Sequence, residues 1–179
     1  MINYETNKSS YFDANKIYCE TIESKLKAIN LDCTGFCNSY GYEIETCLKR
    51  DNLTYNIRYH KHQSTQNGVI VPVDSIDYAG VIVTVTGIDR KYCMTVGKSL
   101  FRRFFCSDEI KEKTPKPYFI NTNNYIDNTD IYKLLERLQD NKISTIKLRK
   151  GKLICIIHVP TADPIKLISD IEKTIKNWA

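Results

Sequence analysis

The segments 42–49 and 53–60 constrain the fold most, because each alternates apolar and polar residues on either side of a polar turn at Asp51-Asn52. Alternation is the period of a β-strand with one buried face, and two such segments joined by a tight turn form a hairpin. This register places Glu45 opposite Arg58, a charge-complementary cross-strand pair. We therefore predict an antiparallel hairpin with one solvated face. The same register pairs Glu43 with His60, Leu48 with Tyr55, Thr46 with Ile57 and Ile44 with Tyr59.

Other segments also have the composition of strands. Residues 80–86 are apolar on both faces, which is typical of a strand in the centre of a sheet. Lys150-Gly151 lies between two strand-like segments and predicts a second hairpin with a two-residue turn. Pro72 restricts the strand around it to a sheet edge. In chain order, these further strands are predicted over residues 69–73, 80–86, 91–96, 118–120, 143–148 and 153–158.

Three amphipathic segments predict helices. The first covers about 14–30 and has Asp13 as its N-cap. The second is capped by Asp127 or Asn128, and the last follows Asp163-Pro164, an N-cap with proline at the first helical position. Their apolar faces consist of Tyr18, Ile22, Leu26 and Ile29 in the first, Ile131, Leu134, Leu135 and Leu138 in the second, and Ile165, Ile168, Ile171, Ile175 and Trp178 in the last.

The middle of the chain is less regular. Residues 100–105 place aromatic side chains at spacings that fit a short helix or a strand, so both alternatives stay open. Residues 107–128 contain two prolines and four asparagines and are expected to form mostly loop.

The element order is helix, strands, helix, hairpin and helix, which predicts an α+β fold with a single antiparallel sheet and helices packed mainly on one face. We expect a flexible N-terminus over 1–12 and a single domain over 13–179. No export signal or apolar segment of bilayer length (about 20 residues) is visible, so we expect a soluble, cytoplasmic protein. The element order resembles that of small bacterial secretion chaperones and related chaperone-like proteins.

Seven cysteines are present, an odd number at irregular spacing. Without an export signal, this composition indicates free thiols in a reducing compartment. One metal site is conceivable: Cys33 and Cys37 with His60 and His62 have the donor types of a zinc centre. Their spacing matches no standard zinc motif, and we expect neither a metal nor another cofactor.

Positive charge is concentrated in two segments, 98–116 and 147–152. Residues 91–117 carry 7 Lys and Arg against 3 Asp and Glu, whereas residues 1–90 carry 9 against 11. Such segments are candidates for contact with an anionic partner, or form solvated turns. The candidate partner-binding or anion-binding residues are Lys98, Arg102, Arg103, Lys147, Arg149, Lys150 and Lys152.

The sequence contains none of the common catalytic motifs. GxxxxGK[ST], GxGxxG, GxSxG, HExxH and CxxC are all missing. We therefore expect a non-catalytic module that binds another protein, as an adaptor, a chaperone or an inhibitor or immunity factor does. Two alternatives stay open: a nucleic-acid-binding protein that uses segments 98–116 and 147–152, and a zinc enzyme built on the four cysteine and histidine residues above.

Overall fold

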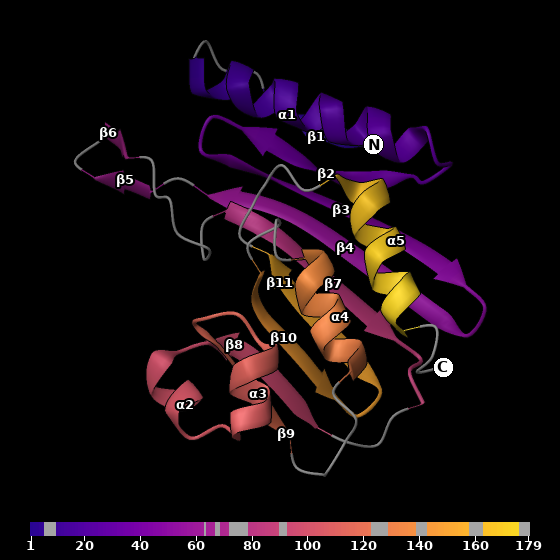
Figure 1. Cartoon of the computed structure of the whole chain (residues 1–179). Helices are drawn as coiled ribbons and strands as arrows, with labels where there is room; N and C mark the ends of the chain where they lie inside the picture. The colour runs from indigo at the N-terminus through magenta and orange to yellow at the C-terminus, as the bar shows by residue number, and fades with distance from the viewer. Residues whose placement is uncertain are drawn as a thin grey trace.

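The chain folds into a mixed α+β structure with an open, mostly antiparallel nine-stranded sheet and five helices in the described residues. Figure 1 shows the computed structural model, which describes residues 1–5, 10–62, 64–66, 69–71, 79–89, 93–122, 129–138, 143–157 and 163–175. The strands are β1 (Ile2–Tyr4), β2 (Cys33–Asn38), β3 (Gly41–Arg50), β4 (Leu53–His62), β5 (Ser64–Gln66), β6 (Val69–Val71), β7 (Ala79–Thr86), β8 (Met94–Lys98), β9 (Tyr118–Thr122), β10 (Ile143–Arg149) and β11 (Lys152–Ile157). The helices are α1 (Ser10–Lys27), α2 (Leu100–Phe104), α3 (Asp108–Lys113), α4 (Thr129–Leu138) and α5 (Pro164–Ile175).

Strand β7 lies at the centre of the sheet, as its apolar composition predicts. The order across the sheet is β1-β2-β3-β4-β7-β11-β10-β8-β9, while β5 and β6 form a separate two-stranded ribbon. One flank of β7 is therefore built from the N-terminal part of the chain and the other from the C-terminal part (Figure 1). The β1–β2 pair is parallel, and the other pairs among the described strands are antiparallel.

The predicted hairpin over residues 42–60 is confirmed in every pair of its register. Glu45 is the partner of Arg58 and Ile44 is the partner of Tyr59, with the other three pairs as expected. The second hairpin is also confirmed: Arg149 pairs with Lys152 around the turn. Lys150 and Gly151 both have positive φ, +50° and +69°, which is the mirror-image turn that matches the twist of antiparallel strands.

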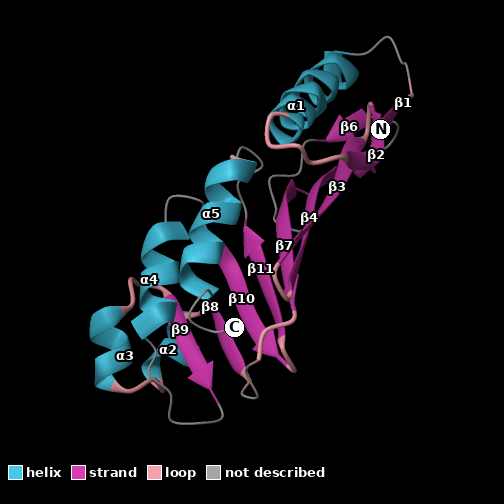
Figure 2. Ribbon diagram, turned by 90° about the vertical axis from the view of Figure 1, so that its right-hand side faces the viewer, coloured by secondary structure: helices cyan, strands magenta, loops and turns pink. Residues whose placement is uncertain are grey.

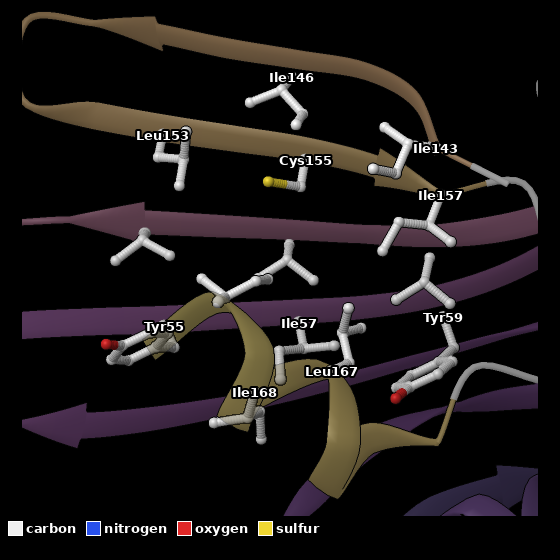
Figure 3. Close-up of a cluster of buried hydrophobic side chains, with 14 of the residues drawn as sticks. Tyr55, Ile57, Tyr59, Ile143, Ile146, Leu153, Cys155, Ile157, Leu167 and Ile168 are labelled. Carbon is white, nitrogen blue, oxygen red and sulfur yellow. The ribbon is translucent and has the colours of Figure 1, made fainter. Parts of the chain in front are cut away.

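The described helices cover one face of the sheet, and none of them covers the other face (Figure 2). Alternate residues of each strand point to the covered face and form the core. In β4 these are Tyr55, Ile57 and Tyr59, all at most 2% exposed. Helix α5 lies over them and contributes Leu167 and Ile168 (Figure 3). We call the uncovered side of the sheet the open face; in β4 it carries Asn56 and Arg58.

The last helix begins where the sequence predicts. Asp163 accepts a hydrogen bond from the backbone N–H of Lys166 at 3.3 Å, and Pro164 is the first helical residue. Ile168, Ile171 and Ile175 are buried, as expected of the apolar face. Trp178 lies outside the described residues. No described helix has both the length and the apolar character that a membrane span requires.

The structure differs from the sequence-based expectation in three places. Residues 2–4 form a strand beside β2, with Ile2 buried, and α1 begins at Ser10 rather than after Asp13. Strand β8, predicted over residues 91–96, begins at Met94, and it pairs with β10 and β9 rather than with the preceding strand β7. The segment expected to be mostly loop contains helix α3 in addition to the predicted edge strand β9.

Candidate functional site

Helix α2 resolves the ambiguity of residues 100–105. Ser99 has extended backbone geometry and its hydroxyl accepts a hydrogen bond from the N–H of Arg102 at 3.2 Å, so it caps the helix that begins at Leu100. After one turn, Ser107 caps α3 in the same way. The two short helices lie beside β9, the edge strand of the sheet (Figure 1).

The apolar side chains of α2 and its C-cap point into solvent. Phe101 and Phe105 pack edge to face with ring centroids 5.2 Å apart, and Phe104 packs in the same way against Phe105 at 5.6 Å. We call this cluster, including Leu100, the aromatic surface. The exposed fractions are 68% for Leu100, 76% for Phe101, 75% for Phe104 and 72% for Phe105. The apolar face of an ordinary short helix packs against the core, so this arrangement is unusual.

Arg103 fixes α2 in place from its opposite side. Its side chain is buried, with 7% of the residue exposed, and its guanidinium points into a set of oxygen acceptors. It donates to the Tyr118 carbonyl at 2.6 Å and to the hydroxyl and carbonyl of Thr114 at 2.7 and 2.9 Å. It also donates to the carbonyl of Lys111. One side chain therefore ties α2 to α3 and to β9, and all of these acceptors are uncharged.

Arg103 is thus not available to a partner, although the sequence indicates it as a candidate. The other candidates of segment 98–116 stay at the surface. Arg102 is exposed, with its guanidinium 5.4 Å from the centroid of the Phe119 ring. Lys98 lies over the Tyr118 ring at 5.4 Å. Phe119 itself is buried, at 5% exposed. The aromatic surface is the functional candidate that charge-based reasoning missed, and its signal was aromatic residues interleaved with arginine.

The second basic group lies on the open face of the sheet. Lys147 and Arg149 are alternate residues of β10, and Lys152 of β11 is the direct partner of Arg149. All three are exposed, and Lys150 is exposed at the turn. Within the part of the chain that the structure describes, Lys147, Arg149 and Lys152 form no ion pair.

The four candidate zinc ligands do not converge. Cys33 and Cys37 belong to β2 and are buried on the core side, opposite Thr46 and Tyr42. His60 and His62 lie on the open-face side of β4, where His60 pairs with Glu43. Burial also raises the pKa of both thiols, which keeps them protonated and poor as ligands. Among the described residues there is no group of three metal-binding side chains.

Comparison with protein-family models, with curated proteins and with solved structures gives no match. The interpretation of this protein therefore depends on its own geometry. Two surfaces stand out: the aromatic surface at the edge of the sheet, and the basic open face.

Proposed function

We propose that the protein is a non-catalytic protein-binding module whose partner docks on the aromatic surface. The observation that carries this proposal is the exposure of four adjacent large apolar side chains, each 68% exposed or more. Their combined exposed area is on the order of 500 Å², as large as the biggest apolar patch on a typical monomer. Covering it yields about 12 kcal/mol of gross hydrophobic free energy, before the costs of association.

The way in which α2 is held supports a docking role. The four Arg103 hydrogen bonds described above and the Ser99 cap fix the helix independently of its exposed side. The edge-to-face contacts among Phe101, Phe104 and Phe105 limit the rotamers of those rings before any partner arrives. A preorganised surface loses less conformational entropy on binding. Aromatic residues and arginine are also the side chains enriched at the energetic centres of protein interfaces.

The proposal includes a reducing, cytoplasmic setting. It is supported by the seven cysteines, all of them in described residues, none of which forms a disulfide. Cys19, Cys33, Cys37 and Cys155 are buried among apolar side chains, where a thiol packs as a small hydrophobic group.

The test compares two exposed apolar positions. In Phe101→Asp/Phe104→Asp the aromatic surface is lost, whereas Ile17→Asp makes the same kind of change at a lone exposed residue of α1, 64% exposed. Partners are captured from native cells and then purified, and binding to each variant is measured by calorimetry. We expect wild type and Ile17→Asp to bind one protein with a negative heat-capacity change, and the double variant to bind at least a hundredfold more weakly.

All three proteins should have the same melting temperature, because the substituted side chains are solvated in the free protein. A partner that binds the double variant as tightly as wild type contradicts the proposal.

A further inference from the structure

Two neighbouring rows of the open face contain cations and hydroxyl groups but no carboxylate. Cross-strand partners place Lys49, Thr54, Thr86, Lys152 and Arg149 side by side in one row across β3, β4, β7, β11 and β10. The neighbouring row contains Cys47, Asn56, Thr84, Ile154, Lys147, Thr95 and Asn121. The two rows together contain four cations, four threonine hydroxyls and no carboxylate.

The cations of these rows have no carboxylate partner in the part of the chain that the structure describes. Lys49, like the three cations of the β10–β11 hairpin, forms no ion pair among the described residues. Arg149 and Lys152 are direct cross-strand partners, a like-charge arrangement that is unfavourable unless solvent or an anion screens it. Strand β3 places two described acids on the open face, Glu43 and Glu45. Both form ion pairs with Arg58.

The spacing fits a chain of anions. Neighbouring strands are about 4.8 Å apart, so Lys49 lies roughly 14 Å from Lys152, with Thr54 and Thr86 between them. Half-buried isoleucines lie beside the cations: Ile154 in the second row, and Ile82 and Ile156 in the next row. The open face therefore combines positive charge, hydroxyl groups and apolar area. A nucleic-acid strand has the complementary sequence of phosphates, sugars and flat bases.

We propose that the open face, over β7, β8, β10 and β11, binds single-stranded nucleic acid through Lys147, Arg149 and Lys152. A duplex fits this face less well, since its major groove, about 12 Å wide, admits a helix or a two-stranded ribbon but not a broad sheet. Single strands lie along sheet faces and along positively charged grooves. Nucleotides are favoured over an acidic peptide because the isoleucines and threonines between the cations match bases and sugars.

A continuation of the binding surface lies at the far edge of the sheet. Phe119 and Gly97 are partners on the same face, and Arg102 lies over the Phe119 ring. Arg102, Phe105, Phe119 and Asn121 line a pocket with a volume of about 440 Å³. Phe119 itself is buried, with 5% of the residue exposed, so the exposed guanidinium of Arg102 and the exposed amide of Asn121 are the groups that can stack on or hydrogen-bond to an unpaired base. A nucleic-acid strand that runs across the sheet from Lys147 toward β9 would reach this pocket.

Fluorescence anisotropy with labelled 12-mers of deoxythymidine and of uridine tests the proposal. We expect binding in the micromolar range at 50 mM salt, and a log–log salt slope of about −2, as for three phosphate contacts on a single strand. Arg149→Glu should weaken binding tenfold or more, while Arg149→Lys should stay within threefold of wild type. The control Lys166→Glu reverses a charge at an exposed position of α5, on the covered side of the sheet, and should stay within twofold.

Four outcomes overturn the proposal. They are the absence of binding at 0.1 mM protein, equal loss of affinity in Arg149→Glu and Lys166→Glu, a duplex 12-mer that binds as tightly as the single strand, and a 12-residue polyglutamate that competes equally well. Circular dichroism of each variant separates loss of binding from loss of fold. Because this surface does not depend on Phe101 or Phe104, Phe101→Asp/Phe104→Asp should retain oligonucleotide binding. This proposal and the protein-docking proposal therefore succeed or fail independently.

Discussion

The guanidinium of Arg103 donates to the carbonyl oxygen of Tyr118 at 2.6 Å, on the last strand of the nine-stranded sheet. The Tyr118 N–H is also satisfied, by the Pro115 carbonyl at 3.0 Å. An edge strand with unpaired backbone groups is a template for aggregation. The α2–α3 segment thus closes part of this edge while it presents the aromatic surface.

Arg103→Ala should lower the free energy of unfolding by about 2–4 kcal/mol, because several buried oxygen atoms lose a charged donor. Arg103→Lys should recover only part of this loss, since an ammonium group cannot reproduce the planar fork. Urea denaturation measures both effects. The neighbouring Arg102→Ala is the control, and its effect should stay below about 1 kcal/mol because the side chain is exposed. Equal effects at the two positions would show that the Arg103 hydrogen bonds contribute little.

The turn between β10 and β11 gives a prediction of the opposite sign. Lys150 adopts φ +50°, a left-handed conformation that asparagine tolerates better than lysine. Lys150→Asn should therefore raise the free energy of unfolding by about 0.5 kcal/mol. Gly151→Ala should lower it by at least about 1 kcal/mol, since φ is +69° and the added Cβ would lie 2.7 Å from the Ile88 carbonyl oxygen. Thermal and urea denaturation of the two variants test both signs; a stabilised Gly151→Ala protein would contradict the turn geometry.

Alkaline pH should destabilise the protein through a buried thiol and a buried phenol. Burial raises the pKa of Cys155 and of Tyr55 to about 12, above their unfolded values of about 8.5 and about 10. Both groups are neutral in the native protein, so their contribution is fully present below the unfolded pKa. It is lost as the pH rises toward 12, at up to about 1.4 kcal/mol per pH unit for each group. Melting temperatures between pH 8 and pH 11 measure this loss. Cys155→Ala should show a shallower decline than wild type, and an unchanged decline would rule out this thiol as a cause.

Zinc should not be required for folding. The candidate cysteines and histidines lie on opposite faces of the sheet, and a structural zinc site needs four donors within about 2.0–2.3 Å of the metal. A chelator should therefore leave the melting curve unchanged, and elemental analysis should find well under one zinc atom per chain. Loss of structure in chelator that zinc restores would contradict the arrangement described here.

The β3–β4 hairpin was predictable because its pattern is local. Alternation fixes which residues share a face, and the charges of Glu45 and Arg58 confirm the offset of the two strands. Strand β8 was also visible in the sequence, but its partners were not. It pairs with β10, whose residues lie about fifty positions away, and no local pattern records a pairing over that distance.

The candidate sites were predictable in residue type but not in role. A lysine or an arginine is a candidate binding residue in any sequence, yet the adjacent residues Arg102 and Arg103 differ in exposure: Arg102 is exposed and Arg103 is buried. Arg103 is buried because α3 and β9 surround it with carbonyl oxygens, and these acceptors are backbone atoms that any sequence supplies. The spacing of the phenylalanines fitted either a short helix or a strand, and nothing local showed that these side chains would remain uncovered.

The central position of β7 has a consequence for how the protein folds. The strand pairs with β4 on one flank and with β11 on the other, and the β7–β11 pairs join residues about seventy positions apart in the chain. Neither flank can complete its hydrogen bonds before those distant segments meet. Loop-closure entropy of this kind slows folding. During synthesis, β7 and the strands preceding it would therefore leave the ribosome long before β11. The edge of β7 that pairs with β11 would be unpaired in the interval, and a chaperone would have most to protect in that period.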